Sequence, residues 1–285
     1  MITCNISGGL GNQLFQIFTT INTAYKYNIR FWFQNKEGYS HRSSYWNTIF
    51  KNLQNYLYLK YPNHLIKQKI YKEINFHYNE IILPNINDNE TVVLNGYFQS
   101  NKYFNEYFEI IYYFLDIDNE KLKQKQKYME YINFEKTTSI HFRIGDYKKY
   151  PSIHPLLNIK YYIQSIEYLI INEKIKEGDT ILYFYEPTKE EEDLNIIKYN
   201  IDYLKIKFHH LQFIDIHKFE LTDWEELLIM SLCISNIIAN STFSWWGAYF
   251  NLNENKTVIY PSLWFGKNAQ KNNTKDLFPE NWIKI

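Results

Sequence analysis

The sequence predicts an α/β fold on two observations. From residue 138 onward, apolar strand segments alternate with amphipathic helical segments, which is typical of parallel sheets covered by helices on both faces. The chain also opens with a short apolar strand, a glycine-rich loop and a helical pattern, the order found in a nucleotide-binding turn. With 285 residues the chain can form one large domain or two of moderate size.

The first half is expected to hold three strands, at residues 2–6, 29–34 and 91–96. Apolar side chains at helical spacing predict a helix that begins near Asn12. Residues 41–65 form a weakly patterned helical stretch. A lysine-rich run at 121–129 indicates a solvated helix just before a domain boundary. We therefore expect an N-terminal domain at 1–134 and a C-terminal domain at 135–285, whose last segment can pack back on the first domain.

The second half contains the regular alternation. Strands are expected at 138–142, 180–185, 211–214, 236–239 and 257–260, and helices at 160–172, 190–199, 224–234 and 243–251. Because short connections join consecutive elements, these strands should lie in one parallel sheet.

Composition excludes several classes of function. The formal net charge is zero, with 31 basic and 31 acidic side chains, so no nucleic-acid partner is expected. The N-terminus has no signal-peptide pattern and no long apolar run follows, which predicts a cytoplasmic protein without a membrane span. Cys4 and Cys233 are expected to be buried, unpaired core residues. We interpret the Asp116-Ile117-Asp118 spacing as a helix start and expect no metal site. The sequence predicts no oligomeric state.

The first candidate segment is His141-Phe142-Arg143-Ile144-Gly145-Asp146-Tyr147. Arg143 and Asp146 leave the carboxyl end of the predicted strand 138–142, and ligands bind at this edge of an open α/β sheet. The planar guanidinium of Arg143 suits bidentate binding of a phosphate. The alternative is a buried strand end in which His141 and Arg143 take part in a structural salt bridge.

The second candidate segment begins with Asn240, Ser241 and Thr242 and continues into Phe243 and Ser244. The first three are favourable N-cap residues, and free N–H groups at a helix start bind anions. A plain helix cap is the alternative for this segment alone. Its occurrence together with an arginine at another strand end favours a bound anion.

The glycine-rich loop places Gly9, Gly11 and Asn12 after the first strand. It matches neither the dinucleotide fingerprint nor the P-loop pattern, because Leu14 stands where the third glycine belongs and no Lys-Ser/Thr pair follows. Glycines allow backbone amides to approach a ligand closely, and Asn12 can hydrogen-bond it. An ordinary strand-to-helix turn is the alternative.

Together these segments resemble glycosyltransferase family 11, the α-1,2-fucosyltransferases. That family carries His-x-Arg-Arg-Gly-Asp-Tyr and Asn-Ser-[Ser/Thr]-Phe-Ser-Trp-Trp-Gly-Ala motifs, and the second is intact at 240–248. The stretch at 8–16 resembles the family's N-terminal signature, and the segments at 96–104 and 260–283 also resemble the family, so the resemblance covers nearly the whole chain. It implies an α/β fold of GT-B type, with two Rossmann-like parallel-sheet domains facing each other across a cleft.

The resemblance also implies an activity. The expected reaction is metal-independent, inverting transfer of L-fucose from GDP-β-L-fucose to a sugar hydroxyl, the 2-OH of a galactose, with a nucleotide sugar and a glycan acceptor as partners. Arg143, Asp146 and Asn12 would be the catalytic residues. The donor would be held by residues of both halves: His141, Arg143, Glu186, Gly9, Gly11, Asn240, Ser241, Thr242, Phe243 and Ser244.

Two positions depart from the family pattern. Ile144 replaces the second arginine of the first motif, and Tyr185-Glu186-Pro187 stands where the family commonly shows Ser-Asp-Asp, so that Glu186 keeps a single carboxylate. Two alternatives therefore stay open: a GT-B enzyme with another donor or linkage, and a sugar- or nucleotide-binding homologue without turnover. The proton acceptor is equally open between Asp146 and a phosphate oxygen of the donor.

Overall fold

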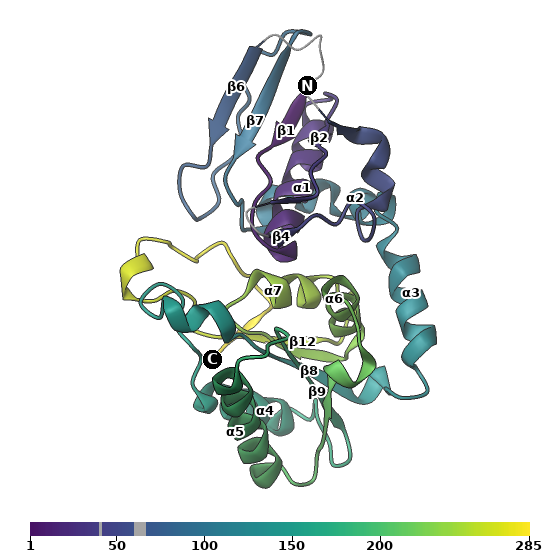
Figure 1. Ribbon diagram of the computed structural model, residues 1–285, viewed down its shortest axis with the longest axis vertical. Coiled ribbons are helices and arrows are strands. Elements are labelled where there is room, and N and C mark those ends of the chain that lie inside the picture. Colours follow the sequence, from purple (N-terminus) through teal and green to yellow (C-terminus); the bar gives the residue numbers. More distant parts are fainter. Residues whose placement is uncertain (40–41, 60–66) are drawn as a thin grey trace. The chain divides into compact units, whose positions relative to one another are not determined.

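The computed structural model describes residues 1–39, 42–59 and 67–285. By internal packing the chain divides into two compact units, which we call the N-terminal unit (residues 1–120 and 272–279) and the C-terminal unit (121–271 and 280–285). Their first boundary follows residue 120 and so falls within helix α3 (Ile117–Tyr128), which is labelled in Figure 1. The segment 272–279 belongs to the N-terminal unit.

The C-terminal unit is built on a six-stranded parallel sheet. In spatial order its strands are β10 (Gln212–Asp215), β9 (Thr180–Tyr185), β8 (Thr137–Phe142), β11 (Ser235–Ile237), β12 (Thr257–Tyr260) and β13 (Ile283–Lys284). Counted along the chain, this is the 3-2-1-4-5-6 order of the Rossmann fold. The order reverses between the neighbouring strands β8 and β11, so the crevice at their carboxyl ends is the expected ligand position.

Helices cover both faces of this sheet (Figure 1). They are α4 (Ile159–Ile171), α5 (Glu191–Lys207), α6 (Asp223–Leu232) and α7 (Thr242–Tyr249). Strand β9 shows how the sequence achieves this: Ile181 packs with residues of α4 and α5, whereas its neighbours Leu182 and Phe184 pack on the opposite face with residues of α6. Because side chains alternate along a strand, a nearly continuous apolar run is needed to bury both faces.

Helices α6 and α7 pack closely at Gly247. A Cβ atom at this position would lie 2.5 Å from the Sδ atom of Met230, whose side chain is buried. Gly247→Ala should therefore lower the free energy of unfolding by about 1–3 kcal/mol, because overpacking a filled core forces neighbours out of place. Gly9→Ala is the control, since apart from its chain neighbours no heavy atom of the described residues lies within 4 Å of its added Cβ. Urea denaturation tests this, and equal midpoints for the two variants would contradict it.

The N-terminal unit holds a smaller parallel sheet in the order β1 (Ile2–Cys4), β7 (Glu90–Asn95), β6 (Lys67–Lys72). Two further pairs are β2 (Phe33–Gln34) with β5 (Leu57–Tyr58), parallel, and β3 (Gly38–Tyr39) with β4 (Arg42–Ser43), antiparallel. Its helices are α1 (Leu10–Lys26), α2 (Phe108–Phe114) and the first residues of α3.

The buried side-chain amide of Gln16 links the first loop of this unit to the loop after β7. The Oε1 atom of Gln16 accepts the Ser7 N–H and its Nε2 atom donates to the carbonyl oxygen of Gly96, each at 2.9 Å. The loop after β1 and the loop after β7 are thereby held at the same edge of the sheet.

Two sequence predictions for this unit need correction. The helical stretch at 41–65 is wrong: it contains β4, a 3₁₀ helix (Lys51–Tyr56) and β5, while residues 41 and 60–65 lie outside the described residues. Its buried apolar residues, Tyr45, Trp46, Ile49, Phe50 and Leu53, are covered by tertiary packing and do not lie along one helix face. Strand β6 was not predicted, because its lysines and mostly exposed side chains suit the edge of a sheet and give little apolar pattern.

Candidate functional site

Strands β8 and β11 bring the two candidate segments together. The strands pair in parallel with Ile140 opposite Ile237. Arg143 and Asn240 each follow three residues later, so both leave the same edge of the sheet from adjacent strands. This edge is the point where the strand order reverses, and we call the residues gathered there the switch-point site.

Arg143 is held from three sides. Its Nη1 atom contacts the Glu186 carboxylate, its Nη2 atom contacts the Asp146 carboxylate, and its guanidinium carbon lies 4.8 Å from the centre of the Tyr147 ring. The Arg143 side chain is 14% exposed. The guanidinium is therefore fixed at the sheet edge, with a part of its surface open to solvent.

The 3₁₀ segment that carries Asp146 (Gly145–Lys149) is fastened to two neighbouring elements. The Tyr147 hydroxyl donates to the carbonyl oxygen of Asn240 at 2.9 Å, and the Lys148 ammonium lies 2.5 Å from the buried Asp193 carboxylate at the start of α5. Gly145 has a φ of +42°, a backbone conformation that a side chain would strain. These contacts tie the turn after β8 to the loop before α7.

His141 lies beneath Arg143 and is buried. It points to the sheet face opposite Ile140 and Phe142, with its ring 5.6 Å from that of Phe243, and its Nδ1 atom has no hydrogen-bond partner among the described residues. Burial, with a further contribution from the Arg143 charge, lowers the pKa of His141 to about 3. The imidazole is therefore neutral at neutral pH, which leaves Arg143 as the cation here.

The pKa of His141 predicts acid sensitivity. Since its folded-state pKa is depressed below the value of about 6.5 in an unfolded chain, unfolding takes up a proton below that pH. The stability from neutral His141 is complete above pH 6.5 and is lost as the pH falls toward 3, by on the order of 4 kcal/mol. In urea denaturation from pH 7 to 4, His141→Gln should show a shallower loss than the wild type. The exposed His209→Gln should follow the wild type, and identical pH profiles for all three proteins would refute the assignment.

The segment before α7 combines buried and accessible groups. Asn240 is buried, its Nδ2 atom donates to the Pro155 carbonyl oxygen at 2.9 Å, and its Oδ1 atom has no hydrogen-bond partner in the part of the chain that the structure describes. Ser241 is the N-cap of α7 and accepts the N–H of Phe243 at 3.3 Å. Thr242 and Phe243 are partly exposed, while Ser244 is buried and its hydroxyl oxygen accepts the backbone N–H of Ala239 at 3.2 Å. Asn240 and Ser244 therefore shape the turn, the buried Ser241 caps the helix, and Thr242 is partly exposed at its first position.

A second group of polar residues follows the next two strands. Tyr185, at the end of β9, donates to Asp215 Oδ2 at 3.0 Å, at the end of β10. Asp215 Oδ1 accepts the backbone N–H of His217 at 2.9 Å, and the ring atom Nε2 of His217 lies 3.4 Å from the buried Glu226 carboxylate. Burial tends to lower the pKa of His217, but Glu226 and Asp215 outweigh it and the net shift is upward. The sequence signal for this group was available, because Asp215 directly follows the predicted strand 211–214.

Gly9, Gly11 and Asn12 lie in the N-terminal unit. Gly9 is the N-cap of α1, whereas Gly11 is buried within the first turn, because the helix begins at Leu10, two residues before Asn12. Asn12 Oδ1 accepts a hydrogen bond from Gln99 Nε2 at 3.0 Å. The left-handed position of the loop is Gly8, with a φ of +80°. The roles assigned to Gly9, Gly11 and Asn12 in binding stay predictions.

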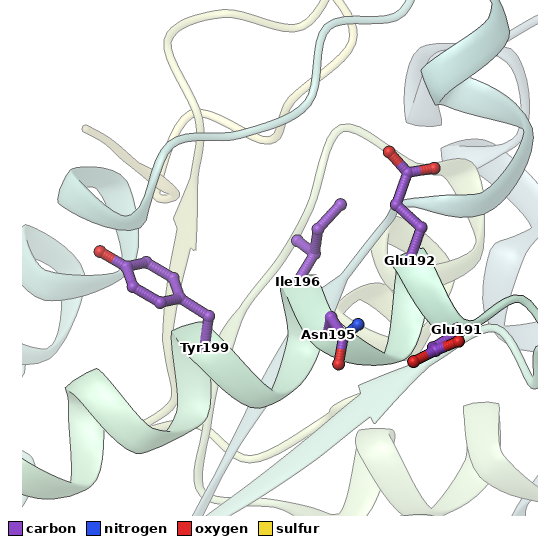
Figure 2. Close-up of a pocket in the computed structure, with 5 residues that line it drawn as sticks. All are labelled: Glu191, Glu192, Asn195, Ile196 and Tyr199. Carbon is purple, nitrogen blue, oxygen red and sulfur yellow. The ribbon is translucent and has the colours of Figure 1, made fainter.

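An open hollow lies on the outer side of α5. It has a volume of about 530 Å³ and is lined by Glu191, Glu192, Asn195, Ile196 and Tyr199, which Figure 2 shows projecting from successive turns of the helix. None of the residues predicted for the donor site lines it.

Other sequence expectations concern metals, cysteines and membranes. Across residues 1–39, 42–59 and 67–285, no three His, Cys, Asp or Glu side chains gather as metal ligands, and no helix is long and apolar enough to span a bilayer. Asp116 directly precedes α3, as expected of a helix start. Cys4 and Cys233 are both buried and unpaired, which confirms the prediction for them.

Comparison with known proteins decides the family. The sequence profile of glycosyl transferase family 11 matches residues 1–285. The chain belongs to glycosyl transferase family 11. The predicted resemblance is thereby confirmed, and the two parallel-sheet units, one with the Rossmann strand order, confirm the predicted α/β fold class.

Two curated relatives of this family 11 chain come from Escherichia coli. The O-antigen biosynthesis glycosyltransferase WbnK is 33% identical over 152 residues, which is 52% of this chain and 44% of that protein. An alpha-1,2-colitosyltransferase is 31% identical over 193 residues, 67% of this chain and 61% of that protein. The matches thus span less than two thirds of either relative.

Two solved structures are similar at lower identity. A variant of Arabidopsis thaliana FUT1 in complex with GDP has a TM-score of 0.45 and 10% identity, covering 91% of this chain and 69% of that one. The fucosyltransferase NodZ from Bradyrhizobium has a TM-score of 0.44 and 9% identity, covering 87% and 91%.

Proposed function

We propose that this family 11 chain is an inverting glycosyltransferase that moves L-fucose from GDP-β-L-fucose to the 2-OH of a galactose acceptor. The observation that carries the proposal is the position of Arg143, at the carboxyl end of the Rossmann sheet where the strand order reverses, beside the start of α7. Membership of family 11 supports the class of reaction. FUT1, among the similar structures, is described in complex with GDP.

The diphosphate of the donor would lie against Arg143 and the start of α7. A guanidinium binds phosphate oxygens bidentately, and the Ser241 and Thr242 hydroxyls at a helix N-terminus add donors to an anion. These groups would stabilise the charge that develops on the leaving diphosphate, so the reaction would need no metal ion for this step.

The guanine base would lie at Asp215. Its carboxylate stands at the end of β10, on the same sheet edge as Arg143 and two strands away, with the aromatic ring of Tyr185 between. A carboxylate can accept both N–H donors of the guanine Watson–Crick edge, whereas adenine presents an acceptor there. In this proposal the base and the diphosphate would both lie along the same sheet edge.

In the proposed reaction the acceptor oxygen forms a bond to the anomeric carbon. The bond from that carbon to the β-phosphate oxygen breaks, and its electron pair leaves with GDP, held by Arg143. The acceptor proton passes either to a carboxylate, for which Asp146 is the candidate, or to a phosphate oxygen. Asp146 contacts Arg143, so it is also placed to orient the guanidinium.

A different donor is the second candidate. One relative is an alpha-1,2-colitosyltransferase, and the sequence departs from the usual family pattern at Ile144 and Glu186. Ile144 replaces an arginine of the family pattern and lies in the apolar core with Phe142. The switch-point site therefore has no second guanidinium from this position. A colitosyl donor belongs in any test of donor choice.

The test is GDP release from GDP-fucose, in a chelator, with and without galactose-terminated acceptors. Acceptor-stimulated release of GDP is the expected result. Release of GDP from a colitosyl donor, but not from GDP-fucose, would show that the transferred sugar is colitose and not fucose. Binding of GDP-fucose without release with any acceptor would favour a sugar-nucleotide-binding homologue.

A further inference from the structure

Two carboxylates compete for the charge of Arg143. Glu186 and Asp146 each contact one terminal nitrogen of the guanidinium, so that the three side chains together carry a net charge of −1. A bidentate phosphate uses the same terminal nitrogens. A nucleoside diphosphate therefore has to replace at least one of the two carboxylates.

Glu186 is better placed to be replaced. Asp146 lies three residues after Arg143 in the same turn, and this turn is fastened to Asn240 and Asp193 through Tyr147 and Lys148. Glu186 comes from a different loop, directly after β9, and its side chain is one methylene longer than that of Asp146. Rotation of its side chain can free Nη1 without moving the backbone of the site.

We propose that Glu186 is a competing anion on Arg143 that a nucleoside diphosphate displaces, so that it sets nucleotide affinity and favours release of the product. The proposal rests on the proposed function in one respect, that Arg143 binds the diphosphate. After displacement the carboxylate stays within a few ångströms, a distance over which salt screens little. Its repulsion lowers the affinity of every diphosphate ligand.

The repulsion should differ between substrate and product. Free GDP carries more negative charge on its terminal phosphate than the same phosphate esterified to a sugar. A nearby carboxylate therefore weakens GDP binding more than donor binding. Glu186 thus acts as a specificity-determining residue that distinguishes product from donor by charge.

Calorimetric titration of Glu186→Gln with GDP tests the proposal, because glutamine keeps the size of the side chain and removes its charge. The dissociation constant of GDP should fall about tenfold, an order-of-magnitude expectation for removing a like charge beside a phosphate. The constant for GDP-fucose should fall by a smaller factor. Glu190→Gln is the matched control, because Glu190 pairs with Lys148 and not with Arg143.

The outcomes separate this inference from the proposed function. Unchanged or weaker GDP binding by Glu186→Gln would overturn the inference that Glu186 competes with the diphosphate. Tighter GDP binding by Asp146→Asn, without tighter binding by Glu186→Gln, would also overturn it. Equal tightening of GDP and GDP-fucose would overturn the discrimination between product and donor. Full GDP affinity in Arg143→Ala would instead contradict the assignment of Arg143 as the phosphate ligand.

Discussion

Arg143→Ala is expected to lower the rate of sugar transfer by about 100- to 1,000-fold, the usual effect of removing one preorganised donor from a developing anion. The loss should exceed that of an ordinary ionic contact for a structural reason. The variant removes the cation and leaves Glu186 and Asp146 facing the diphosphate. GDP affinity should therefore fall together with the turnover number.

Arg143→Lys should restore little of this activity. Lysine supplies a charge but not the planar fork that contacts Glu186 and Asp146 through separate nitrogens. The exposed Arg30, in the N-terminal unit, provides the control, since Arg30→Ala should keep full activity. Steady-state GDP release measures the rates, and thermal denaturation shows whether each variant is folded. Turnover by a folded Arg143→Ala protein within threefold of wild type would exclude Arg143 as the residue that stabilises the leaving diphosphate.

Asp215→Asn is expected to abolish most of the preference for guanine. Hydrogen bonds to a charged group contribute about 1.5–3 kcal/mol each, so GDP affinity should fall roughly 10- to 100-fold. ADP affinity should change little, because adenine offers no matching pair of donors. Asparagine retains an acceptor oxygen for the N–H of His217, so the local turn is preserved.

Calorimetric titration with GDP and ADP measures this change in selectivity. Asp202→Asn is the control, because Asp202 forms an exposed pair with Lys198 on α5. A GDP-to-ADP ratio in Asp215→Asn equal to that of the wild type would show that the base is bound elsewhere.

The C-terminal sheet could be predicted from the sequence because its strands are buried on both faces. Ile181, Leu182 and Phe184 stand in an apolar run that admits no half-exposed strand. Strands β8 and β11 are also fully buried but include polar residues, so the alternation with helices was needed to locate them. The position of Arg143 followed from the same pattern, since polar residues after such strands gather at one edge. Asp215 obeys this rule as well and could have been included.

Other features depend on tertiary structure. The contact between Arg143 and Glu186 requires that β8 and β9 be neighbours, with Phe142 opposite Tyr185, and neither local sequence expresses that register. In the N-terminal unit, β6 gave too little apolar signal. The 3₁₀ helix between β4 and β5 was not predicted, because the aromatic residues of this stretch are buried without a regular spacing that identifies it.

A crystal structure of the chain with GDP would test the central claim most directly. We predict that the β-phosphate lies within hydrogen-bond distance of Arg143 and near Ser241 and Thr242, with the base at Asp215 and the Glu186 carboxylate turned away from Nη1. GDP bound at another part of the C-terminal unit, with Arg143 still paired to both carboxylates, would contradict it.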